Sequence, residues 1–183
     1  MLFRSIGALV VRDRHAVEAI IHGGGQQFGI RPGTENVPGI VGLGVAVELA
    51  AREQAAFAAR VAALRDELER RLLAVVPDAV INAAHGRRAP HVTSVSIPGT
   101  DSEALLMHLD LAGIACSSGS ACSTGAIEPS HVLTAMGVPR ELGVAALRFS
   151  FGKDNTTEDV EATVAVLPKI VEKVRALSAV LHR

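Results

Sequence analysis

The longest regular pattern of apolar and polar positions lies in the first half of the chain and has the period of a helix. Apolar side chains recur on one helix face at spacings of three and four residues, at Val61, Leu64, Leu68 and Leu72. The helical stretch reaches back to Val37, and Asn36 before it is a suitable N-cap. We therefore predict a helix over residues 37–73, long enough to link two subdomains. A break near Arg52–Gln54 is the alternative.

The segment before this helix has two parts. Gly7–Val11 is short and apolar, which predicts a strand, and a helical turn is expected over His15–Ile21. Five glycines then fall within eleven residues, at Gly23, Gly24, Gly25, Gly29 and Gly33. The N–H groups of such a loop, at the start of a helix, suit a phosphate, and Thr34 adds a hydroxyl there. A tight turn without a ligand is the alternative, and a P-loop is excluded because no Gly-Lys-Ser/Thr follows.

Shorter elements follow Pro77, where we place a domain boundary that divides the chain into residues 1–77 and 78–183. Strand patterns cover residues 79–83, 91–97 and 145–151. The first predicted helix begins at a capping box, Thr100–Glu103, and runs to Leu109, with Gly113 after it. A short helix is predicted from Pro129 to Gly137. The last helix begins at a second capping box, Thr156–Asp159, and runs towards Arg183 with a kink at Pro168. The pattern predicts an α/β chain, in which a long linking helix precedes a small α+β domain.

Composition excludes several classes of protein. The 183 residues include 18 basic and 19 acidic ones, and the net charge of −1 gives no general attraction to nucleic acid or to an anionic membrane. No apolar run approaches the roughly 20 residues that span a bilayer, and the first residues lack the pattern of a signal peptide. We therefore expect a cytoplasmic protein with reduced thiols.

The two cysteines have different surroundings. Cys116 follows an apolar stretch, which favours a thiol packed against the core. Cys122 lies in the Ser/Gly-rich segment Ser117–Gly125, which has little to bury, so its thiol is a candidate nucleophile on a mobile loop. A loop cysteine without a role is the alternative. His131 is the nearest further ligand, no fourth one is evident, and no metal site is predicted.

Arg148 is unusual because it lies within the apolar pattern of a predicted strand. An arginine in a half-buried strand usually has a partner. One candidate is the carboxylate of a substrate, bound through two parallel hydrogen bonds. The other is an Asp or Glu of the chain itself.

Three motifs, in order, resemble the cysteine desulfurases, which belong to the class V aminotransferase group of PLP enzymes with fold type I. The first joins Gly23-Gly24-Gly25-Gln26-Gln27 to Arg31-Pro32-Gly33-Thr34-Glu35-Asn36-Val37-Pro38-Gly39-Ile40. The second joins Ser117-Ser118-Gly119-Ser120-Ala121-Cys122 to Glu128-Pro129-Ser130-His131-Val132-Leu133, and the third is Arg148-Phe149-Ser150-Phe151-Gly152. The resemblance covers the chain from about Gly7 to its C-terminus.

The resemblance implies a PLP-dependent enzyme that moves sulfur from L-cysteine to a cysteine persulfide and releases L-alanine, for the synthesis of iron–sulfur clusters or related cofactors. Cys122 stands where the family has the persulfide-forming cysteine, whose sulfur in some members also contacts the cluster being built. Thr34 stands where a threonine reaches the PLP phosphate of the partner subunit in a homodimer, and Arg148 where an arginine holds the substrate carboxylate. An iron–sulfur scaffold or another acceptor protein would receive the sulfur.

The chain also departs from the family pattern. The lysine that binds PLP covalently follows a histidine in the family, and none of Lys153, Lys169 and Lys173 does so here. We therefore expect the C-terminal half of a desulfurase: residues 1–77 would be the end of the large PLP-binding domain with the linking helix, and residues 78–183 the small domain with the cysteine loop. On its own, this half should not catalyse the full reaction. The alternative is a non-enzymatic remnant that acts as an interaction or sulfur-carrying module.

Overall fold

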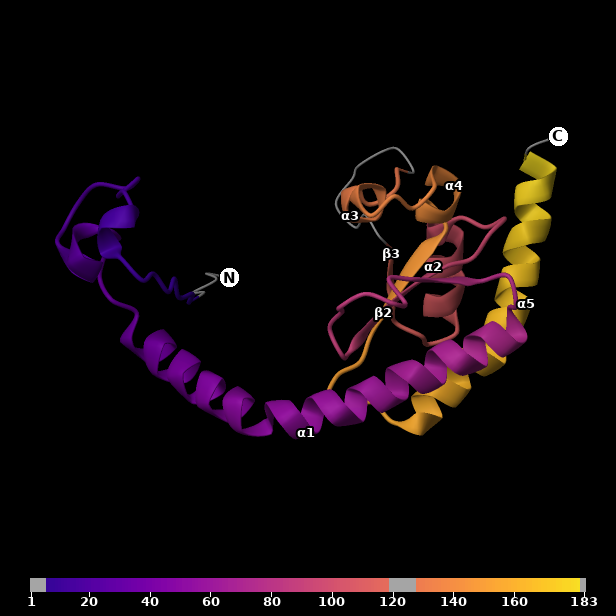
Figure 1. The fold of residues 1–183 in the computed structure, drawn as a ribbon, viewed down its shortest axis with the longest axis horizontal. Coiled ribbons are helices and arrows are strands. Elements are labelled where there is room, and N and C mark those ends of the chain that lie inside the picture. Colours follow the sequence, from indigo (N-terminus) through magenta and orange to yellow (C-terminus); the bar gives the residue numbers. More distant parts are fainter. Residues whose placement is uncertain (1–5, 119–127, 182–183) are drawn as a thin grey trace. The chain divides into compact units, whose positions relative to one another are not determined.

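The computed structural model describes residues 6–118 and 128–181, of which residues 179–181 are described by their backbone alone. Two compact units divide the chain, Met1–Ala55 and Ala56–Arg183 (Figure 1). These units reflect contacts within this chain. The division into domains 1–77 and 78–183 refers to a longer enzyme and stays a prediction.

Among the described residues before the long helix, 6–36, the regular elements are short helical turns. They are η1 at Arg14–Ala16 and η2 at Gln26–Gly29. The predicted strand at Gly7–Val11 is wrong for this structure: the segment is irregular, and Val10 is 93% exposed. A strand needs a hydrogen-bonded partner, and no described strand pairs with this segment. The helical turn expected over His15–Ile21 is also wrong in extent, because η1 covers only its beginning.

The long helix α1 runs over Val37–Val75, close to the predicted range, and it is unbroken at the alternative site near Arg52–Gln54. Asn36 is its N-cap, as predicted, and the side-chain Oδ1 accepts a hydrogen bond from the Gly39 N–H at 3.3 Å. The predicted apolar stripe is confirmed, since its residues are the buried ones of the helix, Val61, Leu64, Leu68 and Leu72. Only the second half of α1 therefore contributes to the core of the second unit.

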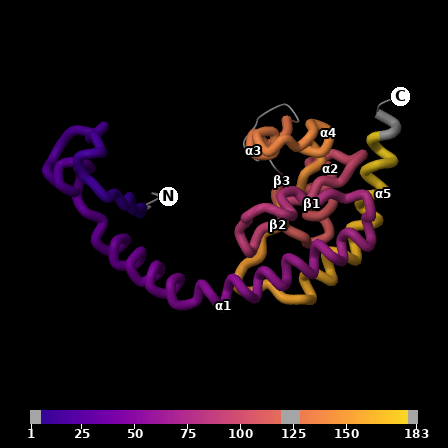
Figure 2. Tube along the Cα trace, viewed as in Figure 1, coloured from indigo at the N-terminus to yellow at the C-terminus, as the bar shows by residue number. Residues whose placement is uncertain are grey.

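The described part of the second unit is built on one antiparallel sheet with strand order β1-β2-β4-β3, of which Figure 2 labels β1, β2 and β3. The strands are β1 at Val80–Asn82, β2 at Val92–Ser96, β3 at Ser117–Ser118 and β4 at Ala146–Ser150. The predictions for β1, β2 and β4 are confirmed. The two-residue strand β3 was not predicted.

The described part of this unit also contains four further helices. They are α2 at Ser102–Leu111, α3 at His131–Ala135, α4 at Arg140–Gly143 and α5 at Thr157–Leu181. The helix predicted at residue 100 begins later, because Asp101 is its N-cap and the Thr100 hydroxyl instead donates to the Ile97 carbonyl at 2.6 Å. Helix α5 continues as one element through Pro168. None of the helices in the described part of the chain is both long and apolar enough to cross a membrane.

The two faces of the sheet differ in chemistry. Direct partners on antiparallel strands point to the same face, and Val95 is opposite both Ile81 and Leu147. Val95 and Leu147 are fully buried in a core shared with the second half of α1, with α2 and with α5. The other face carries polar partners, Asn82, Ser94, Arg148 and Ser117. The helices therefore cover the apolar face, and the polar face carries Arg148.

Arg60 connects α1 to the loop that follows β4. Its guanidinium donates hydrogen bonds to three main-chain carbonyls, those of Gly152 at 3.0 Å, Lys153 at 2.6 Å and Asn155 at 2.6 Å. Asn155 Oδ1 in turn accepts a hydrogen bond from the Gly152 N–H at 2.7 Å. The loop after the C-terminal end of β4 is thus held by the Arg60 side chain and by the hydrogen bond between Asn155 and Gly152.

Replacing Thr93 with valine should stabilise the chain. Thr93 is 1% exposed, and within the described ranges its Oγ1 has no hydrogen-bond partner. Valine keeps the branched shape and removes a buried polar atom, so the free energy of unfolding should rise by about 1 kcal/mol. Urea denaturation measures the change. Thr93→Ser, which keeps the hydroxyl and loses the methyl group, should instead destabilise; a less stable valine variant would contradict the prediction.

Candidate functional site

Arg148 lies in the middle of β4, on the polar face of the sheet. Its direct neighbours across the strands are Ser94 of β2 and Ser117 of β3. The residue is exposed, not half-buried as the strand pattern suggested, because both flanking residues, Leu147 and Phe149, point to the core instead. No Asp or Glu of the described ranges forms an ion pair with it. The guanidinium is therefore available to bind an anion from outside this chain.

Strand β3 leads from the core to the segment that contains the candidate nucleophile. Ser117 pairs with Arg148 and Ser118 with Leu147, and residues 119–127 follow directly. Cys122 is within that segment and lies outside the described residues. The structure thus shows where the chain enters the segment, which is the strand next to Arg148.

Cys116, the other cysteine, is half-buried and packs against the hydrophobic core, as predicted. Burial, assisted by the negative charge of Asp110, raises the pKa of this thiol to about 11. A thiol with so high a pKa is almost entirely protonated near neutral pH and is a poor nucleophile. Its environment is that of a structural thiol.

Thr34 belongs to the first unit, and Arg148 belongs to the second. It is exposed and lies three residues before the first residue of α1. Gly29 and Gly33 in the loop before it have positive φ angles of 78° and 109°, which only glycine adopts readily. These two glycines are therefore required by the turns themselves. The exposed hydroxyl beside the start of a long helix nevertheless has the chemistry that a phosphate needs.

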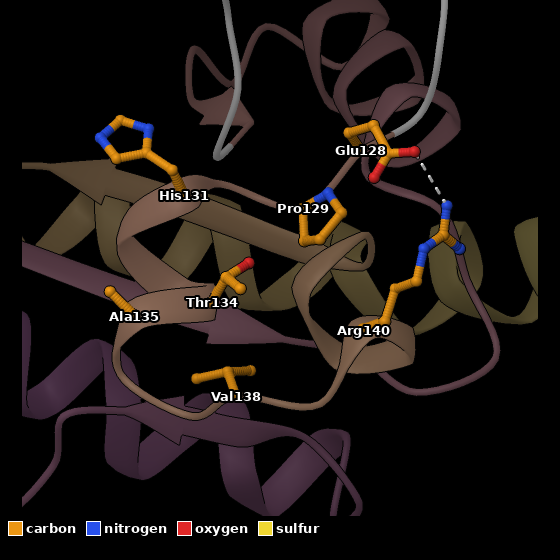
Figure 3. A pocket seen from close by; sticks show the side chains of 7 residues that line it. All are labelled: Glu128, Pro129, His131, Thr134, Ala135, Val138 and Arg140. Atoms are coloured by element: carbon orange, nitrogen blue, oxygen red, sulfur yellow. Dashed lines mark hydrogen bonds and ion pairs between the residues drawn. The ribbon is translucent and has the colours of Figure 1, made fainter.

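A pocket of about 590 Å³ lies between α3 and α4 (Figure 3). Its charged residues are Glu128 and Arg140, whose side chains form an ion pair at 3.3 Å. His131 also lines it. In the part of the chain that the structure describes, no group of three His, Cys, Asp or Glu side chains is placed to hold a metal ion.

Comparison with known proteins identifies relatives. Residues 6–163 match the family model described as aminotransferase class-V. The chain is 46% identical over 175 residues to a protein named cysteine desulfurase from Gluconacetobacter diazotrophicus, and 41% identical over 175 residues to cysteine desulfurase IscS from Dictyoglomus turgidum. Each alignment covers 96% of this chain and 44% of the relative. The chain thus spans somewhat less than half the length of these relatives.

Solved structures agree with the sequence comparison. A NifS-like protein from Rickettsia africae superposes with a TM-score of 0.73 at 34% identity, over 84% of this chain and 40% of that one. Another NifS-like protein gives a TM-score of 0.71 at 36% identity, over 85% of this chain and 38% of the other. The predicted fold, part of a PLP enzyme of fold type I, is confirmed. Class-V aminotransferases are PLP-dependent enzymes, and this chain belongs to the class-V aminotransferase family.

Proposed function

We propose that this chain supplies the C-terminal part of a PLP-dependent cysteine desulfurase, which transfers sulfur from L-cysteine to Cys122 and releases L-alanine. The observation that carries the proposal is the placement of Arg148. It is an exposed guanidinium on the polar face of the sheet, and the neighbouring strand β3 leads into the Cys122 segment. The cysteine desulfurases among the relatives support the same function.

Arg148 would bind and orient the substrate. A guanidinium offers five N–H donors in a planar fork, and a carboxylate accepts two of them in parallel. Binding of the substrate carboxylate there would fix one end of L-cysteine and leave its thiol to face the incoming nucleophile. No acidic side chain of the described ranges competes for this fork.

Cys122 would perform the sulfur transfer. Its thiolate attacks the sulfur of the bound L-cysteine, an S–S bond forms, and the Cβ–S bond of the substrate breaks. The electron pair of that bond stays with the carbon fragment, which takes up a proton and leaves as L-alanine. PLP, when bound, supplies the electron-withdrawing group that makes this cleavage possible.

Thr34 would contact the PLP phosphate of the partner subunit in a homodimer. An exposed hydroxyl close to the N-terminus of α1 fits a phosphate, because the helix end carries a partial positive charge. Lys153, Lys169 and Lys173 are all exposed, and none is assigned to the cofactor. The persulfide would then pass to an iron–sulfur scaffold or another acceptor protein in the cytoplasm.

The exposed lysines favour a second candidate function. A chain that lacks a lysine for PLP could still accept sulfur on Cys122 from a separate desulfurase and carry it to a partner. Such a sulfur-carrying module would use the Cys122 segment and would not need Arg148 to bind L-cysteine.

One experiment separates the two functions. This chain, joined to the N-terminal part of a cysteine desulfurase that carries the PLP lysine, is loaded with PLP and given L-cysteine; L-alanine is then measured by chromatography, and sulfane sulfur is measured on the protein. A desulfurase should form both in step. Sulfane sulfur on Cys122 that appears only when another desulfurase is added, with no L-alanine formed by the protein itself, would favour the carrier. L-alanine formation that is independent of PLP would contradict the proposed function.

A further inference from the structure

One row of polar side chains crosses all four strands of the sheet. Asn82 of β1, Ser94 of β2, Arg148 of β4 and Ser117 of β3 are successive partners in the strand register. Direct partners on antiparallel strands point to the same face, and their Cβ atoms are about 4.5–5.5 Å apart. Ser94 is therefore the immediate neighbour of the residue to which we assign the substrate carboxylate.

Asn82 determines how the hydroxyl of Ser94 is used. It is 6% exposed, and its side-chain Nδ2 donates to Ser94 Oγ at 3.1 Å and to Ser96 Oγ at 3.0 Å. Both hydrogens of the amide are thereby occupied. Ser94 Oγ accepts one of them through a lone pair, so its own hydrogen must point away from Asn82. Across the residues that the structure describes, that hydrogen has no acceptor.

We propose that the Ser94 hydroxyl donates a hydrogen bond to the same carboxylate that Arg148 binds, and that Asn82 is the positioning residue that directs this hydroxyl. The inference rests on the proposed function, since it requires a substrate carboxylate at Arg148. A carboxylate has about four acceptor positions, and Arg148 fills two. Arginine has no acceptor of its own, so the guanidinium and the hydroxyl bind one ligand side by side.

Substitution of Ser94 tests the proposal in the same PLP-loaded enzyme, which contains this chain as its C-terminal part. Ser94→Ala should raise the inhibition constant of L-alanine, the product, about tenfold, the effect of one lost hydrogen bond to a charged group. The inhibition constant of ethylamine, which has the same carbon–nitrogen unit without the carboxylate, should not change. KM for L-cysteine should rise with kcat nearly unchanged.

Ser96→Ala is the matched control. Ser96 receives the other Asn82 hydrogen bond, but its neighbour on β4 is Ala146 in place of Arg148. It should leave the inhibition constants of both ligands as they are. Equal effects of the two serine substitutions, or an equal loss of ethylamine binding by Ser94→Ala, would show a merely structural role and overturn the inference.

Arg148→Lys in the same assay shows whether a failure concerns the Ser94 hydroxyl alone or the carboxylate site at Arg148. If Arg148→Lys weakens L-alanine selectively and Ser94→Ala does not, the hydroxyl assignment is wrong and the carboxylate site stands. If neither substitution distinguishes L-alanine from ethylamine, the carboxylate site itself is wrong, and the inference is overturned with it.

Discussion

In the proposed enzyme that contains this chain as its C-terminal part, a Cys122→Ala variant should bind L-cysteine and PLP as the unaltered enzyme does, but it should form no persulfide. Without the attacking sulfur the Cβ–S bond of the substrate has no acceptor for its sulfur atom, so L-alanine production should fall to the uncatalysed level. Chromatographic assay of L-alanine measures the loss. Mass spectrometry of the unaltered protein after brief exposure to L-cysteine should show one added sulfur on the peptide that contains Cys122.

Cys116 is the natural control for this experiment. With a pKa of about 11, only roughly one Cys116 thiol in ten thousand is ionised at pH 7, because each pH unit below the pKa lowers the thiolate fraction tenfold. Cys116→Ala should therefore retain activity. Added sulfur on the Cys116 peptide, or full activity of Cys122→Ala, would contradict the assignment.

In the proposed full-length enzyme, with this chain as its C-terminal part, an Arg148→Lys variant should lose affinity for the substrate. Lysine keeps the charge but replaces the planar fork by a single ammonium group, so one of two parallel hydrogen bonds to the carboxylate is lost. Loss of a charge-assisted hydrogen bond weakens binding by about 10- to 100-fold. The loss should appear in KM for L-cysteine while kcat stays nearly constant, if the contact is equally strong in the ground and transition states.

Arg70→Lys provides the comparison for Arg148→Lys. Arg70 lies on α1, is 68% exposed and pairs with Glu67 at 2.7 Å, so its replacement should leave KM and kcat unchanged. PLP content should be normal in both variants, because neither arginine is assigned to the cofactor. An Arg148→Lys protein with unchanged KM and kcat, or one that is empty of PLP, would remove the carboxylate role.

The elements that the sequence predicted correctly are those whose own residues decide their structure. The stripe of Leu64, Leu68 and Leu72 specifies a buried helix face, and the strand-forming residues of Val92–Ser96 favour a strand. The predictions that failed concern segments whose structure depends on pairing with another strand. Gly7–Val11 has the composition of a strand, but it has no neighbour to pair with among the described strands. The two serines of β3 have no strand preference, and only their pairing with β4 makes them a strand.

The candidate site was predictable as single residues and not as an arrangement. Arg148 could be singled out because an arginine interrupts an apolar strand pattern. Ser94 and Asn82 could not, because the period of a strand gives the face of a residue and not its register against a strand more than fifty positions away. Thr34 and Cys122 stay predictions, the first in the other unit and the second outside the described residues.

The contact of Arg60 with the loop after β4 also bears on how this protein can vary in evolution. The groups that Arg60 binds are main-chain carbonyls, which every amino acid possesses. Lys153 and Asp154 are exposed, so mutations at these two positions can change their side chains without losing the contact. Selection to keep this contact therefore acts on Arg60 and on Asn155, whose side chain accepts the hydrogen bond from the Gly152 N–H. The intervening positions are left open to neutral drift.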